Sequence, residues 1–145
     1  MHIEASAIVR APQERVCAVF TDVTNWPRVF PAIAGVRTIR DDPPRVEVLL
    51  EHREGLVPNE LIIAAPDLVL LEERKKHYRA TFVNRFRALP DGTTSYEVRG
   101  WVTLFGWRRL LQIAARPLAR RRLSALTVQP VKAAAESSPG LDLGD

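Results

Sequence analysis

Four polar side chains interrupt stretches in which every second residue is apolar: His52, Asn59, Asn84 and Tyr96. Alternate residues of a β-strand share a face, so each of these groups falls among apolar neighbours on the face that a sheet would bury. A buried polar group without a partner costs about 1–3 kcal/mol, so each needs a partner from the protein, from water or from a ligand. A structural hydrogen bond would account for any one of them. Together they indicate an apolar cavity with a polar end, and Asn84, between Phe82 and Phe86, is the strongest candidate.

The sequence lacks the residue patterns that other common chemistries require. The histidines and the single cysteine do not have the spacing of a zinc site: His2, Cys17, His52 and His77. No glycine-rich phosphate loop, dinucleotide fingerprint or Gly-x-Ser-x-Gly motif occurs. Glu72 and Glu73 are adjacent, so in a strand they point to opposite faces and do not form an acid–base pair. We therefore predict no metal, no cofactor and no catalytic residue.

The apolar alternation predicts one strand and then, after two short helices, about six more. Short strands at close spacing, joined by turns such as that at residues 90–93, describe an antiparallel sheet with one wet face. The two helices are predicted within residues 11–31, where Pro27 and Pro31 exclude one long helix. The predicted strands span residues 2–10, 35–40, 45–53, 56–65, 68–74, 77–89 and 94–104.

The last predicted element is a helix over residues 104–126. Pro117 lies in its interior, so we expect a kink or break about one turn earlier. Residues 129–145 are mostly small, polar or turn-forming, so we predict a disordered C-terminal tail there. The apolar residues that recur at helical spacing, and that we expect to form one stripe, are Trp107, Leu110, Leu111, Ala114, Leu118 and Ala125.

The composition fits one globular domain. The chain has 145 residues, of which 46% are hydrophobic, and this is enough for a single core, which we place at residues 1–128. The single cysteine excludes an internal disulfide and suits a reducing compartment. No export signal is apparent, and no apolar run reaches the roughly 20 residues of a membrane span. We therefore expect a cytoplasmic protein.

The net charge of +4 is concentrated in one segment. Residues 98–135 carry eight Lys and Arg residues and no acidic residue, whereas residues 1–97 carry 13 basic and 14 acidic residues. Such a segment is either a solvated helix face or a surface for phosphate groups. We expect weak, salt-sensitive contact with an anionic membrane surface and no binding of nucleic acid. The arginines concerned are Arg108, Arg109, Arg116, Arg120, Arg121 and Arg122.

These elements predict a cavity. An antiparallel sheet of this kind curls, and the final helix must lay its apolar side across the concave face. The two short helices then close one end, and Asn84 and Tyr96 meet the polar end of a ligand. The predicted apolar walls are Trp26, Phe30, Val48, Leu50, Leu61, Phe82, Val98, Leu111 and Leu118.

The N-terminal motif resembles that of a known superfamily. The dipeptides Ala11-Pro12, Trp26-Pro27 and Phe30-Pro31, with Asp22 at the end of the first predicted helix, are similar to the opening of the START-like superfamily. The similarity is to its polyketide cyclase/dehydrase and lipid-transport branch. It extends through the hairpin and the final helix, over residues 3–127. It implies an α+β helix-grip (START/Bet v 1-like) fold, in which a curved antiparallel sheet of about six or seven strands surrounds a long C-terminal helix.

The resemblance also implies a cavity for an apolar small molecule such as a lipid, quinone or polyketide. Some relatives catalyse aromatic cyclisation with cavity tyrosine and arginine side chains. Here Ala32, Ile33 and Ala34 occupy the positions where such a tyrosine is expected, and residues 54–73 contain no Lys or Arg. These absences favour a non-catalytic carrier over a polyketide aromatase/cyclase. A macromolecule-binding module that uses the basic helix is a third alternative, and the ligand's identity and the oligomeric state stay open.

Overall fold

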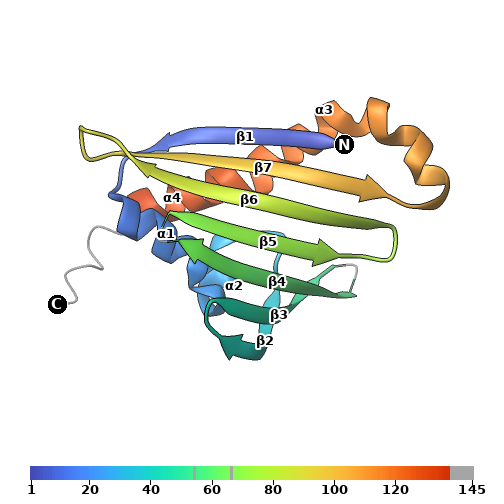
Figure 1. Cartoon of the computed structure of the whole chain (residues 1–145), viewed down its shortest axis with the longest axis horizontal. Coiled ribbons are helices and arrows are strands. Elements are labelled where there is room, and N and C mark those ends of the chain that lie inside the picture. Colours follow the sequence, from blue (N-terminus) through green and yellow to red (C-terminus); the bar gives the residue numbers. More distant parts are fainter. Residues whose placement is uncertain (54, 66, 138–145) are drawn as a thin grey trace.

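A seven-stranded antiparallel sheet forms most of the fold (Figure 1). The computed structural model describes residues 1–53, 55–65 and 67–137. The strand order is β1-β7-β6-β5-β4-β3-β2, so the two N-terminal strands lie at opposite edges. The predicted strands are all present: β1 (His2–Val9), β2 (Gly35–Asp42), β3 (Arg45–His52), β4 (Gly55–Ala65), β5 (Leu68–Arg74), β6 (Tyr78–Ala88) and β7 (Thr94–Leu104).

The register of β6 and β7, the strands that follow β1 in the sheet order, places the polar candidates. β6 pairs with β7 so that Asn84 lies opposite Val98 and Phe86 lies opposite Tyr96. All four are buried, because residues at alternate positions of a strand share the concave face. The connecting turn is held by the Asp91 carboxylate, which accepts hydrogen bonds from the backbone N–H and the hydroxyl of Thr93 at 3.0 and 2.5 Å. The predicted hairpin is therefore confirmed.

Two short helices follow β1, as predicted. They are α1 (Gln13–Thr21) and α2 (Trp26–Val29), and a single 3-10 turn (η1, Val23–Asn25) joins them. The indole N–H of Trp26 donates a 2.8 Å hydrogen bond to the Phe20 carbonyl. The Trp26 and Phe30 rings pack edge to face, with centroids 5.5 Å apart. This contact fixes the bend between the helices and places both rings inside the curl of the sheet.

The C-terminal helix is longer and less regular than predicted. It begins as a 3-10 helix (η2, Gly106–Leu111), continues as α3 (Gln112–Leu123), widens into a π-helical turn (η3, Ser124–Val128) and ends as α4 (Gln129–Ser137). α3 continues through Pro117, and the change from 3-10 to α geometry lies between Leu111 and Gln112, close to the position expected for a kink or break. A π-helical turn lies just before Pro130, whose ring crowds the preceding turn and which has no N–H to donate.

The prediction of a disordered tail from residue 129 is wrong for residues 129–137. Val131 and Ala135, four residues apart on α4, are fully buried and belong to the hydrophobic core. The Lys132 ammonium donates a 2.6 Å hydrogen bond to the Ile8 carbonyl, and the Glu136 carboxylate accepts a 2.8 Å hydrogen bond from the Arg10 N–H. Two small apolar residues at helical spacing and these two hydrogen bonds hold this segment against the core. The rest of the predicted tail, residues 138–145, lies outside the described residues.

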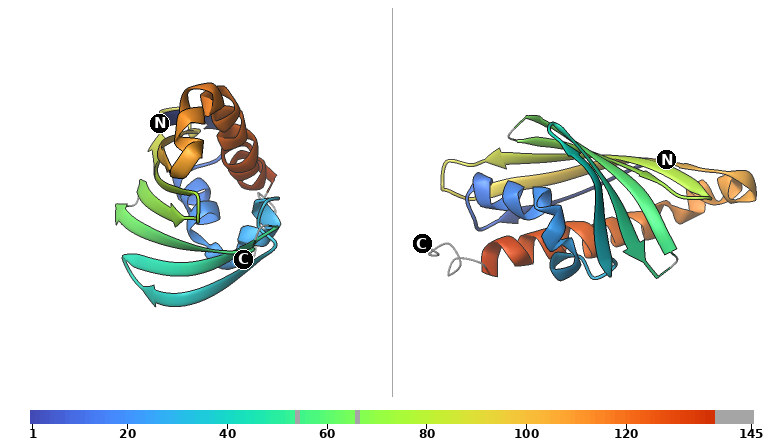
Figure 2. Two further views of the ribbon diagram at one scale, coloured as in Figure 1. Left: turned by 90° about the vertical axis from the view of Figure 1, so that its right-hand side faces the viewer. Right: turned by 90° about the horizontal axis from the view of Figure 1, so that it is seen from below.

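All the helices lie on the concave side of the sheet (Figure 2). The C-terminal helix runs beside β1, and α4 also contacts α1. The core contains Phe20, Trp26 and Phe30 from the short helices, together with Leu123 and Val128 from the long one. The predicted helix-grip arrangement is confirmed.

Candidate ligand-binding site

A cavity of about 630 Å³ lies between the concave face of the sheet, α2 and the C-terminal helix. Most of its wall is apolar, and the walls come from β1, β3, β5, β6 and β7 on the sheet side. The predicted site residues that line it are Trp26, Phe30, Leu50, His52, Phe82, Asn84, Val98 and Leu118. The cavity has the volume of a small-molecule site.

The other predicted site residues do not line the cavity. Val48 and Leu61 are fully buried in the core, and Asn59 is buried with its amide nitrogen donating to the Val57 carbonyl at 3.3 Å. Leu111 is 45% exposed and is not among the residues that line the cavity. Strand alternation identified the concave face correctly, but it did not separate the part that packs solidly from the part that lines a space. The fifth predicted residue outside the lining is Tyr96.

Asn84 and Tyr96 form a hydrogen-bonded pair within the wall. The Tyr96 hydroxyl donates to the Asn84 Oδ1 atom at 2.8 Å, and the Asn84 amide nitrogen donates to the Val69 carbonyl at 3.4 Å. Tyr96 is fully buried and its ring stacks on Phe86 with centroids 4.9 Å apart. Burial raises the pKa of the Tyr96 phenol, so the group stays a neutral donor. Asn84 reaches the cavity, but much of its hydrogen-bonding capacity is already used inside the protein.

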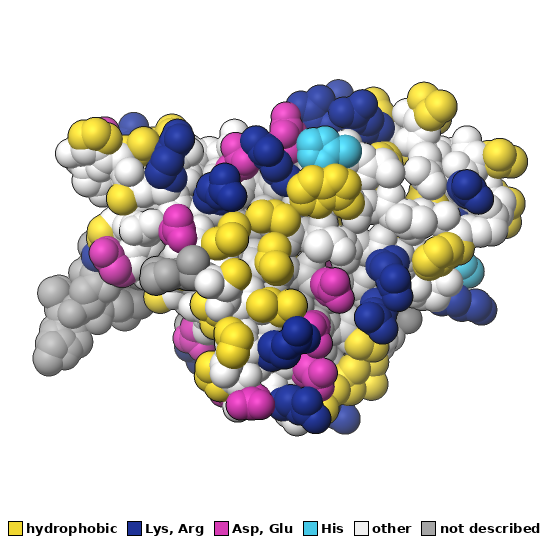
Figure 3. Space-filling model, in the orientation of Figure 1, with side chains coloured by type: hydrophobic (Ala, Val, Ile, Leu, Met, Phe, Trp, Pro, Cys, Tyr) yellow, Lys and Arg dark blue, Asp and Glu magenta, His cyan; other side chains and the backbone are white. Residues whose placement is uncertain are grey.

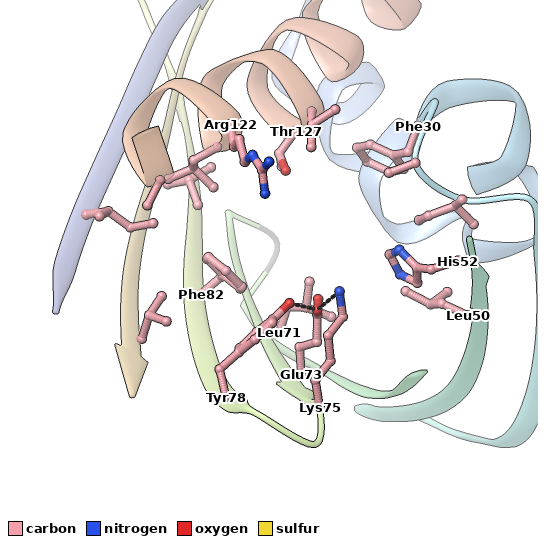
Figure 4. Close-up of a pocket in the computed structure, with 18 of the residues that line it drawn as sticks. Phe30, Leu50, His52, Leu71, Glu73, Lys75, Tyr78, Phe82, Arg122 and Thr127 are labelled. Carbon is pink, nitrogen blue, oxygen red and sulfur yellow. Dashed lines mark hydrogen bonds and ion pairs between the residues drawn. The ribbon is translucent and has the colours of Figure 1, made fainter. Parts of the chain in front are cut away.

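A second polar group, absent from the predicted site, lies where β5 turns into β6 (Figure 4). The Tyr78 hydroxyl donates a hydrogen bond to the Glu73 carboxylate. The Lys75 ammonium lies 3.6 Å from the same carboxylate and 5.2 Å from the centre of the Tyr78 ring. The Glu73 side chain is only 13% exposed, so this ion pair is weakly screened. The arrangement holds a carboxylate, an ammonium and a phenol at one side of a mostly apolar space.

Arg122 and Thr127 face this group from the C-terminal helix, and His52 points inward from β3 (Figure 4). Arg122 has no ion pair with any residue in the described ranges. The charged residues that line the cavity are Arg53, Glu73, Lys75, Arg108 and Arg122, so positive charge exceeds negative. The guanidinium presents several N–H donors in a plane, a geometry that suits a carboxylate, phosphate or carbonyl oxygen.

The inward face of the helix differs from the predicted stripe. Ala115, Leu118, Ala119 and Arg122, at spacings of three and four, line the cavity, whereas Trp107, Leu110 and Leu111 are exposed. Residues 106–111 form a 3-10 helix, which turns 120° per residue, so a pattern drawn at 100° per residue loses its phase there. The predicted stripe also did not identify Arg108 and Arg122 as lining residues, and Arg122 is in addition exposed to solvent. Leu71 and Glu73 lie two residues apart on β5, and Tyr78 and Phe82 lie four residues apart on β6, so each pair shares a strand face. This spacing could have identified the Glu73–Lys75–Tyr78 group as part of the cavity.

The chain belongs to the family described as polyketide cyclase / dehydrase and lipid transport, whose model matches residues 1–136. No curated protein matches it. Among solved structures it is similar to the di-domain aromatase/cyclase StfQ from the steffimycin biosynthetic pathway, with a TM-score of 0.79 and 18% identity over 96% of this chain and 51% of that one. The chain thus spans about half the length of that protein.

Two further structures match over nearly their whole length. The Zhui aromatase/cyclase from Streptomyces sp. R1128 has a TM-score of 0.78 and 15% identity, covering 95% of this chain and 94% of that one. A START superfamily protein from Mycobacterium smegmatis has a TM-score of 0.67 and 14% identity, covering 97% of each chain. At these identities the likeness shows the fold. The predicted START/Bet v 1-like helix-grip superfamily is therefore confirmed, and the family and fold together indicate binding of a hydrophobic ligand.

None of the helices among the described residues is long and apolar enough to cross a membrane. Those residues also contain no group of three or more His, Cys, Asp or Glu side chains that could hold a metal ion.

Proposed function

We propose that this protein binds an apolar small molecule with an anionic or carbonyl-bearing end and does not transform it. The observation that carries the proposal is the cavity of about 630 Å³, whose wall is mostly apolar and into which Arg122 and the Glu73–Lys75–Tyr78 group face (Figure 4). The aromatic walls supply the affinity for an apolar body, at roughly 25 cal/mol per Å² of apolar surface removed from water. The ligand class includes fatty acids, quinones and polyketides.

Arg122 supports recognition of the polar end. Its guanidinium faces the cavity without an ion pair among the described residues, whereas the Lys75 ammonium is already beside Glu73. Arg122 is also exposed to solvent, and its guanidinium can donate charge-assisted hydrogen bonds to an oxygen acceptor of the ligand. The helix position of Arg122, one turn beyond Leu118, also places this donor next to an apolar wall.

Native mass spectrometry of protein purified from its own organism tests the first part of the proposal. The expected result is a retained molecule with an apolar body. Absence of any retained molecule, together with no thermal stabilisation by fatty acids, quinones or polyphenols, would show that the cavity does not bind such ligands.

A matched pair of ligands and a matched pair of variants test the polar end. A long-chain fatty acid should bind more tightly than its methyl ester, and Arg122→Gln should weaken binding of the acid by about tenfold. Arg121→Gln is the control, because Arg121 lies on the outer side of α3, in a shallow groove against β1. Equal losses in the two variants, or equal affinity for acid and ester, would exclude recognition by Arg122.

Catalysis of the aromatase/cyclase type is the second candidate, and the Tyr78–Glu73 contact favours it. A carboxylate that accepts a phenol proton donor at the edge of an apolar cavity can move a proton to or from a bound substrate. Turnover of an aromatic polyketide precursor that is abolished in Glu73→Gln, while the variant still binds the precursor, would replace the carrier assignment with this one. Of the two tyrosines, Tyr78 lines the cavity and Tyr96 does not.

A further inference from the structure

The three most exposed large hydrophobic side chains among the described residues lie within one short segment. Trp107 is 69% exposed, Leu110 is 86% exposed and Ile113 is 92% exposed. Phe105, which precedes them, is 49% exposed. Single exposed hydrophobic residues are common, but a group of this size on consecutive turns marks an interaction surface. We call Phe105, Trp107, Leu110 and Ile113 the apolar tip.

The 3-10 geometry gathers these side chains on one side. Trp107 and Leu110 both belong to η2 and are three residues apart, so their side chains lie one above the other. Ile113 follows three residues later, in the first turn of α3. Figure 3 shows hydrophobic side chains exposed at this end of the molecule.

Basic side chains border the apolar tip. The Arg108 guanidinium lies 5.6 Å from the centre of the Trp107 ring, and Arg109 and Arg116 are exposed on either side of Leu110 and Ile113 in the sequence. The Phe105 N–H donates a 2.9 Å hydrogen bond to the His77 carbonyl, which brings the exposed Lys76 of the β5–β6 hairpin to the same end. No acidic residue occurs in residues 98–135.

We infer that the apolar tip and its basic border dock on an anionic lipid bilayer. Tryptophan and aliphatic side chains beside arginines are the composition of elements that lie in the membrane interface, where the rings and methyl groups enter the acyl boundary and the guanidinium groups meet lipid phosphates. A second copy of the chain fits less well, because two such ends would bring like charges together. The basic border therefore favours an anionic surface as the binding partner of the apolar tip.

The docking surface adjoins the candidate binding site. Leu104, Arg108 and Ala115 line the cavity from the same stretch of chain that carries the apolar tip. When the protein docks on a bilayer, this end of the cavity would therefore lie close to the lipid headgroups. The inference does not depend on the proposed ligand, since it rests on the outer surface of η2 and α3 alone.

Vesicle sedimentation with the full chain tests the inference. Vesicles of phosphatidylcholine with about one third phosphatidylglycerol should bind the wild type at low salt, and vesicles of pure phosphatidylcholine should bind it far less. The double variant Leu110→Asp/Ile113→Asp should lose at least about tenfold in partitioning, because it places charge in the acyl boundary. Arg109→Gln/Arg116→Gln should lose about fivefold per arginine and show a weaker salt dependence.

Ile39→Asp is the matched control, because Ile39 is an isoleucine 59% exposed on β2 and should tolerate the same change without loss of binding. Circular dichroism should show each variant folded, since the replaced side chains are exposed. Three results would overturn the inference: no binding of the wild type to anionic vesicles, equal binding of the Leu110/Ile113 variant, or a wild-type dimer that this variant dissociates. Binding to an acidic protein in the absence of vesicle binding would also overturn it.

Discussion

The Tyr96 hydroxyl donates a 2.8 Å hydrogen bond to the Oδ1 atom of Asn84, and this bond ties β7 to β6 immediately behind the cavity wall. It makes Tyr96 a structural residue, although its position among apolar neighbours suggested contact with a ligand. Tyr78, the other tyrosine of the chain, reaches the cavity instead. We therefore expect Tyr96 to contribute to stability and Tyr78 to ligand binding, and substitutions of the two residues can test this difference.

Tyr96→Phe should lower the free energy of unfolding by about 1–3 kcal/mol, because it leaves the buried Asn84 carbonyl without its donor. Ligand affinity should change little. Tyr78→Phe is the matched variant and should show the reverse, with a smaller loss of stability and a larger loss of affinity. Urea unfolding and a ligand titration on both variants check this. A loss of affinity in Tyr96→Phe with unchanged stability would contradict the structural role.

Ala115→Phe should fill the cavity and abolish ligand binding while leaving the protein folded. Ala115 lines the cavity from α3, so a phenyl group there occupies space that a ligand would take. Ala114→Phe is the control, because its neighbour Ala114 is exposed and outside the lining. Thermal-shift measurements with a fatty acid should show stabilisation in the control and none in Ala115→Phe. Unfolding of Ala115→Phe would instead mean that the interior is solidly packed.

Val131→Ala should destabilise the protein by on the order of 2 kcal/mol, because it removes buried methyl groups from a core position. Val131 is fully buried, although it lies in a segment that the sequence suggested was a tail. Leu110→Ala is the control, since Leu110 is 86% exposed and its truncation should leave stability nearly unchanged. Chemical denaturation of both variants compares them. Equal stabilities would indicate that α4 contributes nothing to the core.

The docking of α4 should weaken in acid. The Arg10 N–H and the Lys132 ammonium hold the pKa of the Glu136 carboxyl below its usual range. A lowered pKa in the folded state means that the contribution to stability is complete above roughly pH 4.3 and is lost as the pH falls through the lower folded value. Hydrogen exchange of the α4 amides should therefore accelerate in this acidic range in the wild type. Glu136→Gln removes the titrating group, so the additional acid dependence should disappear in that variant.

Much of the sheet and of the concave face could be predicted from the sequence. The seven strands, the bend at Trp26 and Phe30, and the inward orientation of Leu50, Asn84 and Val98 follow from local rules. Strand alternation has a period of two, and proline excludes a long helix, so neighbouring residues alone carry this information. The family motif at residues 11–31 is also a local pattern, so it indicates the helix-grip fold without any tertiary contact.

The tertiary structure decided which inward residues bound a cavity and which pack solidly. Val48 and Leu61 follow the same alternation as Leu50, yet they lie in the core, because this depends on what covers each part of the curved sheet. The helix phase was also decided there: 3-10 geometry at Gly106–Leu111 exposed Trp107 and Leu110, while Arg122 turned inward. The residue pattern along the chain determines which face of a helix or strand is apolar. The partner of that face, and hence whether it borders a core, a cavity or solvent, is set by segments distant in the sequence.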